Sequence, residues 1–124
     1  MQTFDGGCHC GSIRFRVMVD DAQEIIECNC SVCTKKGILH FIVPEERFAL
    51  VQGADAVATY SFNTGVAKHM FCRTCGIHPF YRPRSHPLAW DVNVRCLDDT
   101  GVVDRFPRRA FDGRDWEANV ASLR

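Results

Sequence analysis

Apolar and polar residues alternate along several short segments of the chain. In the first of them, Ile13, Phe15 and Val17 alternate with two arginines, which is the period of a strand with one buried face. Other segments are short runs rich in β-branched and aromatic residues, bounded by glycine or proline. We expect further strands there, at 38–43, 57–62, 69–72 and 90–94.

The helical period occurs once, at the C-terminal end. A helix beginning near Asp115 would place Trp116, Val120 and Leu123 on one face. No repeat, linker or low-complexity tract divides the sequence, so we expect residues 1–124 to form a single domain. The predicted fold is mainly β, with antiparallel sheets and one short C-terminal helix.

Charge and hydropathy exclude two classes of partner. Fifteen basic residues balance fifteen acidic residues, which gives no electrostatic basis for binding nucleic acid or a membrane surface. The longest uncharged apolar stretch, 37–44, is too short to cross a bilayer, and the first residues do not resemble a secretory signal. We therefore expect a cytoplasmic protein. In that reducing compartment, eight cysteines indicate metal or redox chemistry rather than disulfides.

Four of the cysteines have the spacing of a structural zinc site. Cys72 and Cys75 form a C-x-x-C pair followed by glycine, as in a zinc knuckle. Cys8 and Cys10 would supply the other two ligands, because residues i and i+2 of a strand point to the same face. His9 would then point away from the metal. The alternative for the C-x-x-C pair is a redox dithiol.

Three more cysteines lie within six residues, at Cys28, Cys30 and Cys33. Three protein ligands with an open fourth position are typical of catalytic zinc, so we expect a second, more labile ion here. Two alternatives remain open. The triplet would be a second structural site if Cys96 or a histidine closed it, and a redox relay if it bound no metal.

The roles of several polar residues near these cysteines are less specific. Lys35 and Lys36 would offset the charge of a three-thiolate zinc site or hold an anionic substrate, or they are solvated turn residues. We expect Cys96 to be a small buried packing residue. We expect His40, within an apolar run, to be a satisfied core or edge residue.

Four cysteine-rich or aromatic motifs occur in one order along the chain. They are G-x-C-H-C-G at 6–11, C-N-C-S-x-C-x-K-K-G at 28–37, F-C-x-x-C-G at 71–76 and H-P-F-Y-R-P-R-S at 78–85. Together they resemble the glutathione-dependent formaldehyde-activating family, which also includes centromere protein V. The resemblance implies a zinc-stapled fold of the β-tent type. It also implies the division of the seven cysteines into a four-ligand and a three-ligand site that the spacing predicts.

The functional hypothesis is a zinc-dependent carbon–sulfur lyase that acts on a small thiol. The resemblance implies glutathione and formaldehyde as substrates and S-hydroxymethylglutathione as product. The alternative is a non-catalytic zinc-binding scaffold or interaction protein; a hydrolytic zinc enzyme is disfavoured because no H-E-x-x-H motif occurs. The expected catalytic residues are Cys28, Cys30 and Cys33. The candidates for binding the glutathione carboxylates are Lys35, Lys36, Arg82 and Arg84; the alternative for the two arginines is a solvated loop.

Overall fold

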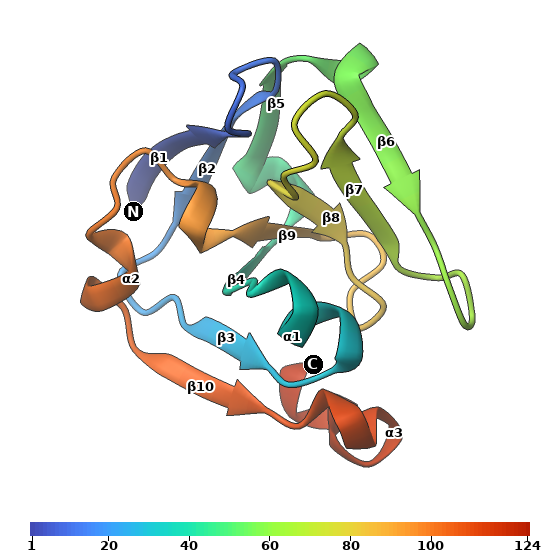
Figure 1. Cartoon of the computed structure of the whole chain (residues 1–124). Coiled ribbons are helices and arrows are strands. Elements are labelled where there is room, and N and C mark those ends of the chain that lie inside the picture. The colour runs from blue at the N-terminus through green and yellow to red at the C-terminus, as the bar shows by residue number, and fades with distance from the viewer.

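The computed structural model describes all 124 residues, which form ten strands in two sheets (Figure 1). The smaller sheet has the order β1-β2-β5. Its strands are β1 (Gln2–Gly7), β2 (Arg14–Val19) and β5 (Phe48–Gln52). The larger sheet has the order β10-β3-β4-β9-β8-β7-β6. Its strands are β3 (Ile25–Cys28), β4 (His40–Val43), β6 (Val57–Tyr60), β7 (Lys68–Cys72), β8 (Phe80–Arg82), β9 (Trp90–Asn93) and β10 (Arg108–Phe111).

Neighbouring strands are antiparallel with one exception. The last strand, β10, pairs in parallel with β3, so that Phe111 lies beside Cys28. The mainly β architecture and its antiparallel sheets are confirmed. The parallel pair was not expected, because nothing in the composition of β10, which carries two arginines, distinguishes it from a loop.

The chain also contains short helices. The expected C-terminal helix is a single α-helical turn, α3 (Trp116–Asn119), followed by a 3₁₀ turn. Two further helices, α1 (Ser31–Lys36) and α2 (Val102–Arg105), are too short to show a helical period in the sequence. None of these helices has the length and apolar character needed to cross a membrane.

The hydrophobic core lies between the two sheets. The smaller sheet contributes Phe15 and Val17 from β2, both buried as their alternation predicts. Phe48 joins the sheets, because its ring stacks on Trp90 with centroids 4.5 Å apart and meets Phe80 edge-on at 5.1 Å. Large aromatic contacts of this kind supply much of the burial energy of a small domain.

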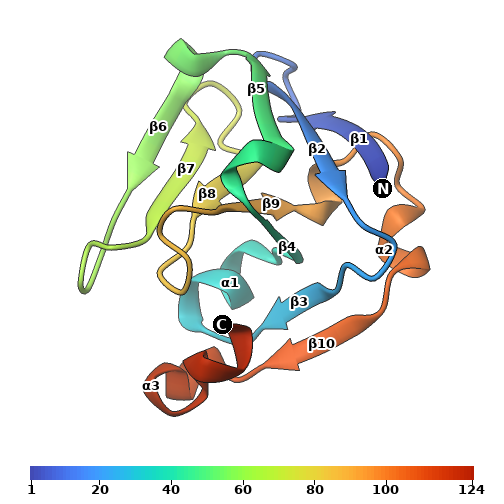
Figure 2. The ribbon, with the colours of Figure 1, turned by 180° about the vertical axis from the view of Figure 1, so that it is seen from behind.

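The larger sheet is covered on both faces near its centre. On β9, Asp91, Val92 and Asn93 are all buried, although successive side chains of a strand point to opposite faces. Val92 enters the core, and its neighbours therefore face the other side. There, α1 and the C-terminal end of the chain lie side by side in both views (Figures 1 and 2).

Two glycines with positive φ differ in how closely they approach the neighbouring backbone. Gly53 (φ +93°) follows β5, and a Cβ atom there would lie 2.1 Å from the backbone oxygen of Ser12. Gly65 (φ +72°) lies between β6 and β7, with nothing within 4 Å of such an atom. Both positions disfavour other residues, but only Gly53 also makes a close backbone contact.

We predict that Gly53→Ala lowers the free energy of unfolding by about 3 kcal/mol or more, because strain and a backbone clash add. The matched control, Gly65→Ala, should cost only about 1 kcal/mol through its φ angle. Urea denaturation of both variants measures the difference. Equal losses would show that the contact between Gly53 and Ser12 does not constrain the fold.

Candidate functional site

Four cysteines from two distant segments form one sulfur cluster. Cys8 and Cys10 follow β1, Cys72 ends β7, and Cys75 lies in the next turn. Their four sulfur atoms all lie within 4.8 Å of one another. Cys10 Sγ is 3.6 Å from Cys8 Sγ and 3.7 Å from Cys72 Sγ. The predicted grouping of these cysteines is therefore present in the structure.

The local geometry of the first pair differs from the prediction. Cys8 and Cys10 lie in a turn after β1 rather than in a strand. Gly11 (φ +84°) closes this turn by donating its N–H to the Cys8 carbonyl, and the Ile13 N–H donates to Cys8 Sγ at 3.3 Å. His9 is exposed and lies outside the cluster. A tight turn, like a strand, brings residues i and i+2 together. Cys8 and Cys10 therefore belong to one cluster as predicted, although they do not lie in a strand.

The second turn of the cluster has the expected knuckle form. Gly76 (φ +81°) donates its N–H to the Cys72 carbonyl at 2.8 Å. Burial raises the pKa of Cys75, but the backbone N–H groups of Cys10 and Ile77 outweigh it and lower that pKa to about 6. This thiol is thus already disposed to ionise, which metal binding requires.

Cys28, Cys30 and Cys33 form a second cluster around the start of α1. Cys28 ends β3, Cys30 is the N-cap residue of α1, and Cys33 lies in the helix. Their sulfur atoms also lie within 4.8 Å of one another, and no histidine or fourth cysteine joins them. Gly37 (φ +66°) ends the helix, with Lys35 and Lys36 in its last turn.

The charges of this second cluster suit a bound cation. Hydrogen bonds from Cys28 and Cys33 lower the pKa of Cys30 to about 2. The same contacts raise the pKa of Cys28 to about 11 and that of Cys33 far above an ordinary thiol, with burial adding to the effect. Three thiolates therefore cannot coexist here without a compensating positive charge. A soft divalent cation such as zinc would supply that charge, so the donor set fits one.

The C-terminal segment packs directly against the triplet. Because β10 runs parallel to β3, the chain leaves the sheet beside Cys28. A Cβ atom on Gly113 would lie 2.5 Å from Cys28 Sγ, so only glycine allows this approach. Asn29, which lies between Cys28 and Cys30, holds this segment in place. Its side-chain amide donates to the Asp112 carboxylate, and its backbone carbonyl oxygen accepts from the Arg114 guanidinium.

A cavity of about 560 Å³ opens beside the triplet. Its floor is the face of the larger sheet that points away from the core. The strand register places the floor residues on that one face, because they are paired across neighbouring strands or lie two residues apart on one strand. They are Ile26, His40, Ile42, Asp91, Tyr81 and His69. The three cysteines form one wall, and the four-cysteine cluster does not border the cavity.

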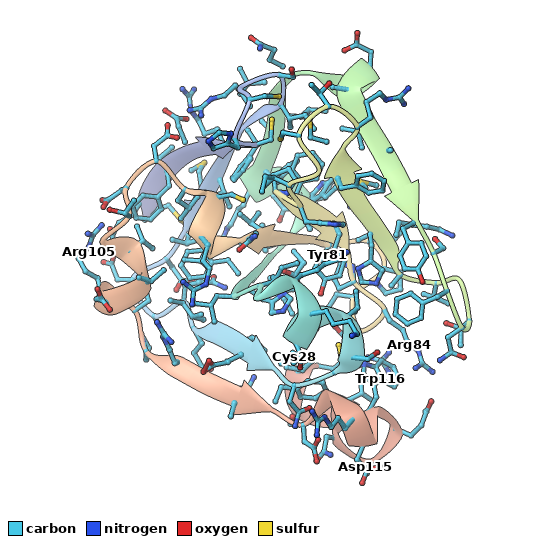
Figure 3. The ribbon with its side chains drawn as sticks, viewed as in Figure 1. Cys28, Tyr81, Arg84, Arg105, Asp115 and Trp116 are labelled. Atoms are coloured by element: carbon cyan, nitrogen blue, oxygen red, sulfur yellow. The ribbon has the colours of Figure 1, made fainter.

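Cationic and aromatic groups border the same cavity. Arg84 lies 3.7 Å over the Trp116 ring and forms an ion pair with Glu117 at 2.7 Å. Arg114 also borders the cavity, and no carboxylate lies within 4.0 Å of its guanidinium. Figure 3 shows Cys28, Tyr81, Arg84 and Trp116 gathered around this region, with Arg105 on the far side of the molecule.

The four predicted substrate-binding residues are not brought together. Arg84 alone borders the cavity. Arg82 lies 3.6 Å over the Trp90 ring and pairs with Glu45. Lys35 is exposed on α1, whereas the half-buried Lys36 places Nζ 2.9 Å from His78 Nδ1, and burial lowers its pKa.

Cys96 stands apart from both clusters. It is half-buried against the core, and its thiol contacts the His78 carbonyl oxygen at 3.7 Å. Burial raises its pKa to about 12. These contacts agree with the expected packing role, and the triplet is not closed by Cys96.

The comparison with known proteins agrees with this geometry. The sequence profile described as "Glutathione-dependent formaldehyde-activating enzyme" matches residues 3–111. A Halomonas elongata protein, provisionally named for the same activity, is 28% identical over an alignment of 98 residues; the alignment covers 68% of this chain and 62% of the relative. The chain thus spans less than two thirds of that relative's length.

A solved structure shows the same fold. The crystal structure of a Rhodobacter sphaeroides protein is 33% identical to this chain and superimposes with a TM-score of 0.74. The match covers 85% of this chain and 99% of that one. The profile match extends over most of the sequence and includes both sulfur clusters. The chain therefore belongs to the glutathione-dependent formaldehyde-activating enzyme family.

Proposed function

We propose that the protein is a zinc-dependent carbon–sulfur lyase that joins glutathione to formaldehyde as S-hydroxymethylglutathione. One observation carries this proposal: an incompletely ligated sulfur triplet forms a wall of a cavity large enough for a tripeptide. None of the cysteines of the four-cysteine cluster lines this cavity. The two clusters therefore suit different roles, one in folding and one in chemistry.

The metal assignment follows from the two donor sets. Cys8, Cys10, Cys72 and Cys75 would hold a structural zinc, and the triplet would hold a second, more labile one. When bound at the triplet, zinc would lower the pKa of a substrate thiol in the open position. All eight cysteines are free, and thiolate ligands must stay reduced, so we place the protein in the cytoplasm.

The cavity residues would bind and orient glutathione. Glutathione carries two carboxylates and one ammonium group around its thiol. Arg84, which stacks on Trp116 and pairs with Glu117, and Arg114, which has no carboxylate partner, would receive the carboxylates. Lys35 and Lys36, at the end of α1, would contribute long-range attraction rather than contact. Binding at these points would hold the thiol beside the triplet and exclude water from the sheet face.

We predict opposite sensitivities for the two clusters. Cys72→Ser should lower the free energy of unfolding by more than about 4 kcal/mol, because a metal that joins distant segments contributes its binding energy to folding. Cys30→Ser should cost about 1 kcal/mol, since serine also caps a helix and the triplet cross-links little chain. Thermal melts and metal analysis test both variants.

The control for these variants is Cys96→Ala, which should leave the metal content unchanged. If Cys30→Ser destabilises the protein more than Cys72→Ser, the structural and reactive roles of the clusters are reversed. A loss of one zinc in Cys96→Ala would make Cys96 a ligand and favour a non-catalytic scaffold.

We predict that glutathione binds at the triplet. In the cobalt-substituted protein, glutathione should change the thiolate-to-cobalt absorption bands, and Cys30→Ser should abolish the change. Arg114→Gln should weaken binding about tenfold, as expected for a lost charge-assisted hydrogen bond. Arg95→Gln is the matched control, because Arg95 is exposed and lies outside the cavity.

Turnover needs a separate measurement, since glutathione and formaldehyde combine without a catalyst. The protein should form the adduct faster than this background. A spectrum unchanged by millimolar glutathione, together with a rate equal to the background, would contradict the proposal and leave a zinc-binding scaffold.

A further inference from the structure

Three polar residues on the cavity floor, His40, Asp91 and Tyr81, have no role in metal or glutathione binding as proposed above. His40 on β4 and Asp91 on β9 are diagonal neighbours on the sheet, and both side chains are only 2% exposed. His40 Nδ1 lies 2.8 Å from Asp91 Oδ1. Tyr81 on β8 pairs with Asp91 in the sheet, and its hydroxyl lies 3.4 Å from the same Nδ1 atom. Three adjacent strands thus supply one connected polar group.

The hydrogen bond to Asp91 selects one tautomer of the neutral imidazole. A carboxylate accepts but does not donate, so Nδ1 carries the proton of the neutral ring. Nε2 therefore has a free lone pair. This nitrogen is buried and has no hydrogen-bond partner in the protein. An unsatisfied buried polar atom is costly and is rarely retained without a function.

The surroundings of His40 indicate the chemical role of Nε2. The ring borders the same cavity as Cys28, Cys30 and Cys33. It is not a further ligand of the sulfur cluster, because its nitrogens fall outside the group of mutually close donor atoms. The arrangement of carboxylate, imidazole and free Nε2 is the one found in general acid–base catalysis, where a carboxylate orients the base.

We infer that His40 transfers the proton between the thiol and the carbonyl oxygen of the substrate, with Asp91 as its positioning residue. This inference rests on the proposed reaction at the cavity. As the sulfur attacks the carbonyl carbon, the S–H proton passes to Nε2 and the C=O π pair moves to oxygen. The imidazolium then returns the proton to that oxygen, which becomes the hydroxyl of the adduct. In the reverse direction Nε2 takes the hydroxyl proton and the S–C bond breaks, so no other reactant is needed.

The first test uses the unaltered protein. In ¹⁵N-labelled, zinc-loaded protein, the NMR shifts of His40 should show a protonated Nδ1 and an unprotonated Nε2. The opposite tautomer would overturn the inference, whether or not glutathione is the substrate, because Nε2 would then be a donor.

The second test separates catalysis from binding. His40→Gln should lower kcat for adduct formation about 100-fold or more and leave glutathione affinity and metal content within twofold of the wild type. Asp91→Asn should lower kcat less, and His86→Gln is the matched control outside the cavity. A kcat within threefold of the wild type in His40→Gln would overturn the inference.

A third measurement distinguishes this inference from the proposed function. By calorimetry, S-(2-hydroxyethyl)glutathione should bind at least threefold more tightly than S-propylglutathione, because its hydroxyl can donate to Nε2. His40→Gln should remove this preference. If the wild type shows the preference but no turnover, the lyase proposal fails and the hydrogen-bonding role of His40 stands. If the preference persists in His40→Gln, the role of His40 fails.

Discussion

Close packing of ionisable thiols is the constraint on which the rest of the structure depends. Seven sulfur atoms lie in two groups whose members are within 4.8 Å of one another. The triplet does not ionise fully on its own, because contacts among its three thiols raise the pKa of Cys28 and Cys33. A bound divalent cation reverses this cost, because each thiolate then gains a partner. The four-sulfur cluster joins the turn after β1 to the turn after β7, and so connects the two sheets.

The cavity beside the triplet lies on one face of the larger sheet. One of its faces is apolar and packs against the smaller sheet, while the other carries His40, Asp91 and Tyr81. The second cluster stands at the edge of that polar face, because Cys28 ends β3. The parallel strand β10 then brings the C-terminal segment over the same edge. Reactive sulfur, a polar floor and cationic groups therefore meet in one cavity, although they come from five separate parts of the chain.

Some of this arrangement could be predicted from the sequence. The alternation around Phe15 identified β2, and cysteine spacing identified both clusters, because both signals are local. The spacing was informative even where the local geometry was wrong, since a turn holds Cys8 and Cys10 together as a strand would. The short strands β1, β3, β5, β8 and β10 were not predicted. Strand β1 contains an aspartate and two glycines, which are depleted in strands, and β10 begins with two arginines.

The remainder depends on register between strands. His40 and Asp91 are 51 residues apart, and only the pairing of β4 with β9 makes them neighbours. From the sequence, His40 is one polar residue in an apolar run, and its unpaired Nε2 cannot be inferred. Arg114 was missed for a similar reason, because its place at the cavity follows from the parallel pairing of β10 with β3.

The central claim is that the two clusters hold zinc in different ways, and X-ray absorption at the zinc edge tests it most directly. With two zinc ions per chain, the account predicts about 3.5 sulfur ligands per zinc on average, with one nitrogen or oxygen ligand completing the second site. An average of four sulfurs with a single zinc per chain would contradict it, because the triplet would then hold no metal.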